Sequence, residues 1–220
     1  MESGKKNIIL FLCLFFVFFQ VSAAEEDIFN HPLAPQTMAA FNAACANLSE
    51  RPIMKGIFEQ EKYLLNLNRS LISSGNFIIA SEHGMVWETL RPFPSTMVLS
   101  KNFIIQSRPD GRRSVISAQG NETFTKMADV INLVFTGRSQ ELIENFDIYF
   151  LGSAANWNMG LLPRDSVFAS FITRITMTGD SSIRSIKLFE KNGDTTTYTL
   201  LNHNFPARLN DHEEAFFTIP

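Results

Sequence analysis

Cysteine, charge and catalytic motifs are all scarce in this sequence. Only two cysteines occur in 220 residues, and Asp, Glu, Lys and Arg together make up 19% of the chain. Lysines and arginines form no continuous stripe that could neutralise a row of phosphates, so a nucleic-acid-binding function is not expected. Attachment to a membrane surface through a polybasic segment is disfavoured for the same reason.

Motifs that would indicate an enzyme are also absent. The sequence contains no G-x-S-x-G, no G-x-G-x-x-G and no P-loop. His212 is followed by two glutamates but lacks the second histidine that a zinc-binding helix needs. The other histidines (His31, His83 and His203) lie in turn-like segments. We therefore expect no enzyme activity, no metal site and no cofactor, and a hydrolase is the weakest of the alternative functions.

The first 24 residues have the pattern of a secretory signal peptide. Lys5 and Lys6 precede an apolar run, Ile8–Phe19, and the small residues of Val21–Ala24 follow it. The run of 12 residues is short of the ~20 that a membrane-spanning helix requires. We expect cleavage near Ala24 or Glu25, export to the periplasm, and loss of Cys13 with the leader.

The remaining residues, 25–220, are expected to form one domain with a large apolar core. Hydrophobic residues make up 45% of the chain, and sixteen of its 21 phenylalanines lie outside the leader. The net charge is −3, and removal of residues 1–24 leaves −4. Cys45 is then the single cysteine, so no intramolecular disulfide can form. It lies on the apolar face of an expected helix, which indicates a buried, unreactive thiol.

Helical spacing of apolar residues appears at two places. Met38, Phe41, Cys45 and Leu48 predict an amphipathic helix that ends before Pro52. Residues 122–135 predict a longer helix that stops at Gly137, and residues 139–144 predict a short helix after it.

The rest of the chain has the sequence pattern of short antiparallel strands. Apolar runs separated by turn residues predict roughly eleven strands and a mainly β (α+β) fold. Asn192-Gly193 predicts a type I′ hairpin turn between residues 183–190 and 195–201, and the last strand is expected at Ala215–Ile219. The other expected strands are residues 57–65, 71–80, 85–89, 96–99, 103–106, 113–117, 146–150, 157–161 and 171–178.

Several of these strands are apolar on both faces, as in residues 77–80 and 97–99. A sheet with one face in water would alternate instead. The pattern leaves two interpretations open, a filled core and an apolar cavity beside the sheet.

Short motifs in the chain resemble the outer-membrane lipoprotein carrier proteins, the LolA-like carriers. The resemblance covers nearly the whole of residues 25–220 and points to a divergent branch of the family. The first half supplies Phe58-Glu59-Gln60, Gly75-Asn76-Phe77, Gly84 leading to Trp87, Pro92 and Met97–Ser100. The second half supplies the helices of residues 122–144, Leu161-Leu162-Pro163, and Glu190–Asp194 followed by a Thr-rich strand to Tyr198.

The resemblance implies an incomplete antiparallel β-barrel of about eleven strands whose concave face is covered by helices. Its function would be to shield the acyl chains of lipoproteins or related lipids on the way to the outer membrane. The partners implied are an acylated cargo, an inner-membrane release complex and an outer-membrane acceptor, with the carrier itself a monomer.

The same resemblance places the binding residues, and a filled core, or a helix packed permanently on the sheet, is the alternative interpretation of these side chains. Two departures from the family pattern suggest a divergent branch with another lipid as cargo. Ser81-Glu82 stand where carriers often have an arginine next to a proline that fastens the lid, so a latch is not expected, and the C-terminal extension that some carriers use in lipoprotein transfer is not expected after Pro220. A periplasmic sensor or scaffold of the same fold is the alternative function. The expected cavity residues are Phe58, Phe77, Ile79, Trp87, Val98 and Trp157, and the expected lid residues are Phe124, Met127, Ile131 and Phe135.

Overall fold

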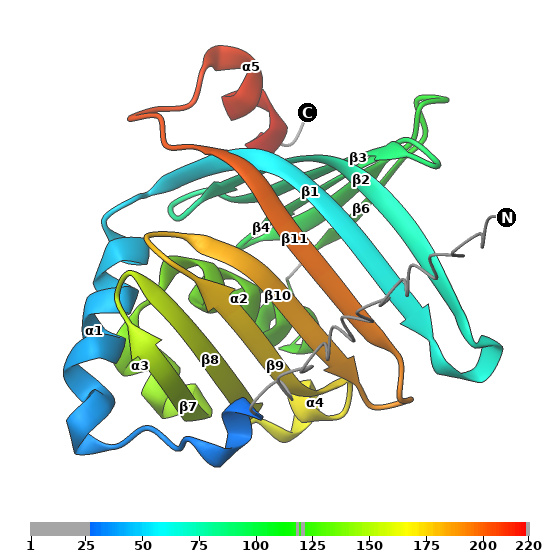
Figure 1. Cartoon of the computed structure of the whole chain (residues 1–220). Helices are drawn as coiled ribbons and strands as arrows, with labels where there is room; N and C mark the ends of the chain where they lie inside the picture. Colours follow the sequence, from blue (N-terminus) through cyan, green and yellow to red (C-terminus); the bar gives the residue numbers. More distant parts are fainter. Residues whose placement is uncertain (1–26, 118, 120–121, 219–220) are drawn as a thin grey trace, which may run out of the picture.

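The protein is an open, curved antiparallel sheet with helices on its inner side (Figure 1). The computed structural model describes residues 27–117, 119 and 122–218. The expected leader, residues 1–24, lies outside the described residues. Strand order is β6-β5-β4-β3-β2-β1-β11-β10-β9-β8-β7, so β6 and β7 are the edges and the barrel stays incomplete. The strands are β1 (Ile53–Leu64), β2 (Arg69–Ala80), β3 (Gly84–Arg91), β4 (Ser95–Ser100), β5 (Phe103–Ser107), β6 (Arg113–Ser117), β7 (Phe146–Ser153), β8 (Asn156–Pro163), β9 (Ile172–Gly179), β10 (Ile183–Glu190) and β11 (Thr195–Asn204).

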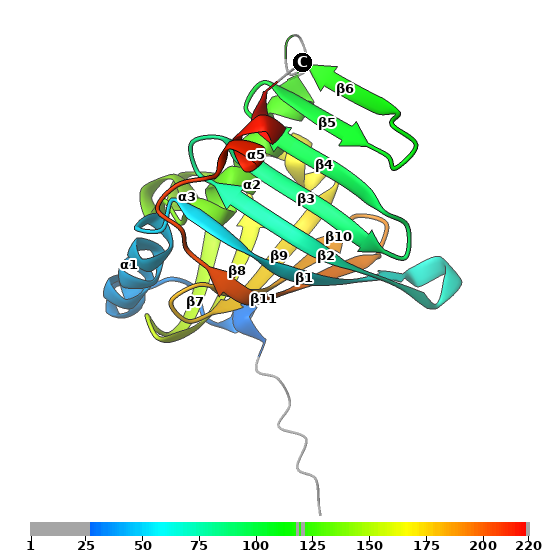
Figure 2. The same cartoon turned by 90° about the horizontal axis from the view of Figure 1, so that it is seen from above.

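The helices occupy the positions that the sequence pattern predicts, with additional short ones. The three expected helices are confirmed as α1 (Pro35–Ser49), α2 (Glu122–Thr136) and α3 (Ser139–Asn145). The short helices are η1 (Ile28–Asn30), η2 (Leu65–Leu67), α4 (Ser166–Ala169), α5 (Asp211–Glu214) and η3 (Ala215–Phe217). The sheet curves around α2, which lies on its concave side (Figure 2).

Gly137 ends α2 at the place where α2 packs against α1. Its φ of +61° is the left-handed conformation that ends a helix. A Cβ there would lie 2.8 Å from the Cβ of Leu48 and 2.9 Å from the carbonyl of Cys45, both on α1. Glycine therefore both stops α2 and lets the two helices pack closely.

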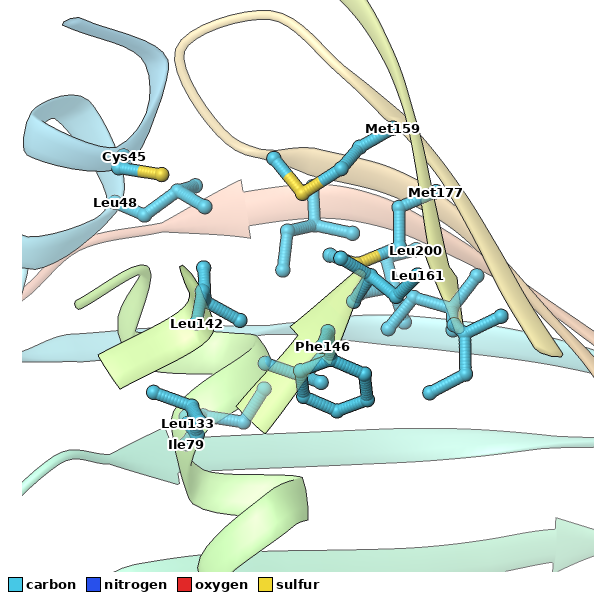
Figure 3. Packing of buried hydrophobic residues seen from close by; sticks show 14 of the residues in the cluster. Cys45, Leu48, Ile79, Leu133, Leu142, Phe146, Met159, Leu161, Met177 and Leu200 are labelled. Carbon is cyan, nitrogen blue, oxygen red and sulfur yellow. The ribbon is translucent and has the colours of Figure 1, made fainter. Parts of the chain in front are cut away.

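The main core fills the space between the concave face and the helices. Strand alternation sends every second side chain to this face, so Phe146, Met159, Leu161, Met177 and Leu200 meet Leu133 and Leu142 of the helices (Figure 3). Cys45 of α1 lies in the same core and is 1% exposed. Burial raises the pKa of its thiol to about 12, so the thiol stays protonated and unreactive.

The convex face of β1–β5 is covered by the end of the chain, residues 205–218, here termed the C-terminal segment. The expected strand at Ala215–Ile219 is wrong, because residues 215–217 form η3 instead. Phe216 and Phe217 pack on a convex cluster, and Leu209 packs beside them. Lys55 and Glu213 form an ion pair at 2.5 Å that ties the segment to β1. The cluster consists of Val86, Val98, Phe103 and Ile105.

The β10–β11 hairpin is confirmed, but its turn is not type I′. Only Gly193 of the Asn192-Gly193 pair has a positive φ, at +89°, whereas type I′ needs two such residues. The N–H of Gly193 donates to the carbonyl of Glu190 at 3.0 Å, and the N–H of Glu190 donates to the carbonyl of Asp194 at 2.9 Å. The side-chain oxygen of Asn192 instead accepts the N–H of Asp194 at 3.0 Å. This contact favours a loop longer than the two-residue type I′ turn, with Gly193 in the positive-φ position.

Candidate functional site

An apolar cavity of about 290 Å³ lies between the concave face of the sheet and α2. It spans the middle of the sheet, because its walls come from β1, β3 and β4 on one side and from β9, β10 and β11 on the other. Twelve of the fourteen lining residues are apolar, and the other two are Gln60 and Tyr198. The apolar members are Met85, Trp87, Met97, Val130, Ile131, Val134, Phe135, Phe168, Ile172, Ile175, Ile186 and Leu188.

Trp87 is the largest side chain of the sheet wall and is held by a stack of aromatic rings. Its ring stacks on Phe58 with centroids 4.1 Å apart, and Phe77 lies behind at 5.9 Å. Tyr198 of β11 meets the same indole edge-on at 5.3 Å. Phe58 and Phe77 are 0% and 1% exposed, so they form the fixed base on which Trp87 presents one face to the cavity.

The helical wall is the apolar stripe of α2. Val130, Ile131, Val134 and Phe135 follow the spacing that places side chains on one face of a helix. Lys126 Nζ donates to Asp165 Oδ2 at 3.0 Å, which connects α2 to the start of α4. Asp165 also accepts the N–H of Phe168 at 2.9 Å and so caps α4, whose Phe168 closes this side of the cavity.

The two polar residues of the lining leave the cavity uncharged. Burial, followed by the nearby Glu190 carboxylate, raises the pKa of Tyr198 to about 12, so its phenol stays neutral. Glu190 is itself paired with Lys62 at 3.0 Å and accepts the hydroxyl of Thr196 at 2.9 Å. A neutral apolar cavity suits a hydrocarbon chain and offers no counter-charge to a headgroup.

The structure brings some of the expected binding residues to the cavity and places others elsewhere. Trp87, Ile131 and Phe135 line it, while Phe58 and Phe77 support it from beneath. Ile79 lies beyond the cavity, where it borders two small hollows of about 20 Å³ each. The side chains of Phe124 and Met127 lie outside the described residues.

Val98 and Trp157 are not at the cavity. Val98 belongs to the convex cluster, because its neighbours Met97 and Leu99 take the concave positions on β4. Trp157 is 1% exposed in β8, where its Nε1–H donates to the carbonyl of Asp180 at 2.7 Å. Its indole packs against Gly179, and both residues stabilise the β8–β9 pairing.

Residues of β9 to β11 form much of the cavity wall and were not expected there. Ile186 and Leu188 alternate with Ser185 and Lys187 along β10, a two-residue period that marks an inward row. That signal predicts a buried face, but it does not tell which end of a long strand meets a cavity.

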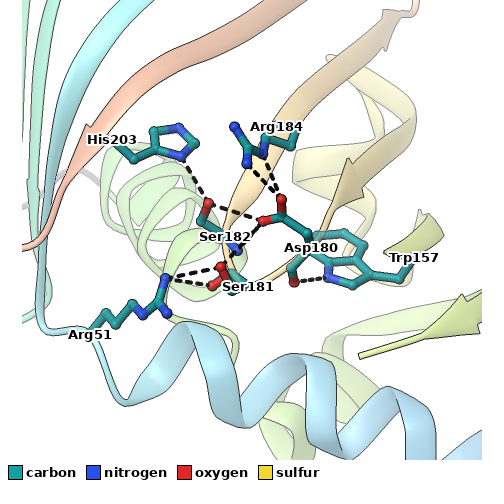
Figure 4. Close-up of polar contacts among 7 residues, drawn as sticks. All are labelled: Arg51, Trp157, Asp180, Ser181, Ser182, Arg184 and His203. Carbon is teal, nitrogen blue, oxygen red and sulfur yellow. Dashed lines mark hydrogen bonds and ion pairs between the residues drawn. The ribbon is translucent and has the colours of Figure 1, made fainter. Parts of the chain in front are cut away.

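A polar cluster beside the β9–β10 turn resembles a catalytic triad in composition only. Ser182 Oγ lies 2.8 Å from His203 Nδ1, and Asp180 carries its carboxylate near Ser182 and Arg184 (Figure 4). A triad needs the carboxylate on the second ring nitrogen, yet His203 Nε2 is buried with no hydrogen-bond partner. Arg51 donates to the carbonyl of Ser181 at 3.0 Å, so the cluster ties the start of β1 to the β9–β10 turn.

Across residues 27–117, 119 and 122–218, no helix combines the length and apolar character needed to cross a bilayer. The same residues hold no group of three His, Cys, Asp or Glu side chains arranged to bind a metal ion.

Comparison with known proteins gives one family match and several solved structures of low sequence identity. A search of curated proteins found no match. A LolA superfamily protein from Nitrosomonas europaea is similar over 83% of this chain and 97% of its own, with 6% identity and a TM-score of 0.45. LprF from Mycobacterium bovis is similar over 82% of this chain and 98% of its own, with 10% identity and a TM-score of 0.43. The MucA/MucB complex from Pseudomonas aeruginosa contains a chain that is similar over 78% of this chain and 59% of its own, with 15% identity and a TM-score of 0.41.

The sequence itself decides the family. The model of the outer membrane lipoprotein carrier protein LolA matches residues 52–217, which run from the start of β1 to the end of η3. This range includes every strand of the sheet and every residue that lines the cavity. The chain therefore belongs to the outer membrane lipoprotein carrier protein (LolA) family.

Proposed function

We propose that the protein is a periplasmic carrier that holds the acyl part of a lipoprotein or a related lipid in the cavity between the sheet and α2. The observation that supports this most directly is the cavity itself, which has about 290 Å³ of space and an almost entirely apolar, uncharged lining. Family membership supports a binding or carrier role, and the expected leader of residues 1–24 supports export.

Acyl chains need such a carrier because water opposes their transfer. Each methylene that leaves water gains about 0.8 kcal/mol, so a long chain does not cross an aqueous space unaided at a useful rate. The cavity is about twice the size of the ~150 Å³ cavity that holds one benzene ring, which corresponds to space for about a dozen carbons. A longer chain would extend through the cavity mouth or displace α2.

The proposed cycle has one inner-membrane step and one outer-membrane step. A release complex in the inner membrane would hand over the acylated cargo, and an acceptor at the outer membrane would remove it. The carrier would act as a monomer and undergo no chemical reaction with the lipid, because its lining offers apolar contact without a nucleophile and base.

The proposal is tested with protein recovered from the periplasm. Its lipid is extracted and identified by mass spectrometry, and the stripped protein is then mixed with a diacylated lipopeptide or with the same peptide lacking its acyl chains. We expect co-purified lipid and binding of the acylated peptide alone. Protein that carries no lipid and takes up neither the lipopeptide nor a free acyl chain would contradict the proposal.

A further inference from the structure

Two turns at one end of the half-barrel, and the strand ends beside them, leave large apolar side chains in solvent. Phe93 is 82% exposed, Leu67 is 65% exposed and Ile72 is 61% exposed. Leu65 in the first turn, Leu71 on β2 and Leu90 on β3 are each about half exposed. A surface cluster of this size marks an interaction site rather than ordinary scatter of apolar residues.

Strand pairing places the two turns at the same end of the sheet. The β1–β2 hairpin closes with Leu64 opposite Arg69, and β2 pairs with β3 up to Ser74 and Arg91. Ile72 therefore lies next to the β3–β4 turn of residues 92–94, and both turns reach out at the same end of the sheet (Figure 2). We call the turns at residues 65–68, 92–94 and 191–194 the loop rim.

The third turn joins the rim through a hydrogen bond. The N–H of Leu65 donates to Asp194 Oδ1 at 2.9 Å, and the Leu65 side chain packs over Gly193. Part of the cavity wall lies near the same end, since its lining residues Gln60, Met97 and Leu188 are within five residues of the three turns.

The arrangement of the apolar side chains favours a lipid surface over a protein partner. Leu71 pairs with Lys62 and Ile72 pairs with Glu61, so these two neighbours point to opposite faces of the hairpin. A protein docked on one face would cover only one of them. The headgroup and acyl boundary of a bilayer surrounds an inserted tip and covers both.

The charges at the rim have the sign that anionic lipids attract. Arg69, Arg91 and Lys191 are exposed, with one at each turn. The stretches at 62–81 and 89–109, which hold the first two turns with β2, β4 and β5, contain no Asp or Glu, although the whole chain has a net charge of −3. The acidic residues nearest to the rim include Glu61 on β1, Glu88 on β3 and the buried Asp194 of the third turn. Basic side chains beside inserted apolar ones are the chemistry of interfacial binding to anionic membranes.

We propose that the loop rim inserts reversibly into the surface of an anionic lipid bilayer and so brings the nearby end of the cavity wall close to the membrane. Leu67, Ile72 and Phe93 enter the acyl boundary, while Arg69 and Arg91 meet the lipid phosphates. This docking is a separate property from the content of the cavity, because none of these five side chains lines it.

The test is co-sedimentation of the exported protein with vesicles of equal parts phosphatidylglycerol and phosphatidylcholine, beside vesicles of phosphatidylcholine alone. We expect binding to the anionic vesicles, and a loss of at least about tenfold in partitioning for the double variant Leu67→Ser, Phe93→Ser. The control is Val115→Ser, which removes another exposed apolar residue (50%) from the edge strand β6 and should bind as wild type. Charge removal by Arg69→Gln with Arg91→Gln should weaken binding to the anionic vesicles only.

Two further readouts keep the docking and the cavity apart. The double variant should unfold at the wild-type temperature and still take up a free acyl chain, because its changes are exposed and outside the cavity. Wild-type protein that ignores anionic vesicles, or a double variant that binds them equally well, would overturn the proposal. So would concentration-dependent self-association that Phe93→Ser abolishes while vesicle binding stays unchanged, because the rim would then be an interface between two copies.

Discussion

Leu188→Glu should separate the cavity from the core, because this half-buried side chain lines the cavity from the rigid strand β10. In the empty protein the new carboxylate can be hydrated from the cavity, so the cost is mainly the lost apolar burial, about 1–2 kcal/mol. For a domain of this length that lowers Tm by about 2–8 °C. The variant should therefore fold.

An acyl chain in the cavity would strip the water from that carboxylate. A buried charge without a partner costs several kcal/mol, and about 3 kcal/mol corresponds to a loss of roughly 100-fold in affinity. Binding is measured by titration with a fluorescent acyl probe, and folding is followed by thermal unfolding of the same samples. Leu188→Met is the control, since it keeps an apolar side chain of similar volume and should bind as wild type.

The reasoning fails if Leu188→Glu is folded and binds the probe within about threefold of wild type, because the acyl chain would then lie elsewhere. The same substitution at Val98 should not act on binding in this way. Val98 lies in the convex cluster, so a charge there damages the packing of the C-terminal segment instead.

Three other outcomes follow from burial and close packing. Because burial raises the pKa of Cys45 to about 12, the native protein should resist a thiol reagent at about pH 8 and react only when unfolded, and rapid native reaction would refute the buried position. Gly179→Ala should cost several kcal/mol in urea unfolding, since its Cβ would collide with the Trp157 indole, and a wild-type midpoint would contradict that packing. Burial alone would raise the pKa of Glu213, but hydrogen bonds from Lys55 and the backbone of Asn210, together with the charges of Lys55 and His212, outweigh it and lower the pKa. A lowered pKa gives stability that is present above the unfolded-state pKa and lost as pH falls through the folded-state value. Hydrogen exchange should therefore show the C-terminal segment still attached to the sheet at mildly acid pH. Glu213→Gln should loosen the segment at neutral pH.

The spacing of apolar residues predicted most helices and strands of this fold, because that spacing depends only on residues close together in the sequence. The helix at residues 122–136 has an apolar stripe and a glycine stop, and both features are written in consecutive residues. The failure at residues 215–217 has a non-local cause. Ala215, Phe216 and Phe217 are apolar like a strand, but they are used to cover the convex face rather than to extend the sheet.

The candidate site was harder to predict than the fold. Strands that are apolar on both faces proved to have two different partners, with the core and cavity on one side and the C-terminal segment on the other. Val98 shows the consequence, since alternation alone cannot say which of two apolar faces is the concave one. The aromatic support of Trp87 by Phe58 joins β3 to β1 across β2, a contact that appears only when the strand register is known.

The central claim is that the space beside Trp87 binds an acyl chain, and the two tryptophans of the sequence allow a direct measurement. Two single-tryptophan proteins, made by Trp157→Phe and by Trp87→Phe, are titrated with a fatty acid that carries bromine atoms, which quench fluorescence at short range. We expect strong, saturable quenching when Trp87 remains and little when Trp157 remains, because Trp87 lines the cavity and Trp157 is buried near the β8–β9 pairing. Absence of quenching at Trp87 under saturating ligand, or equal quenching of both proteins, would contradict the account.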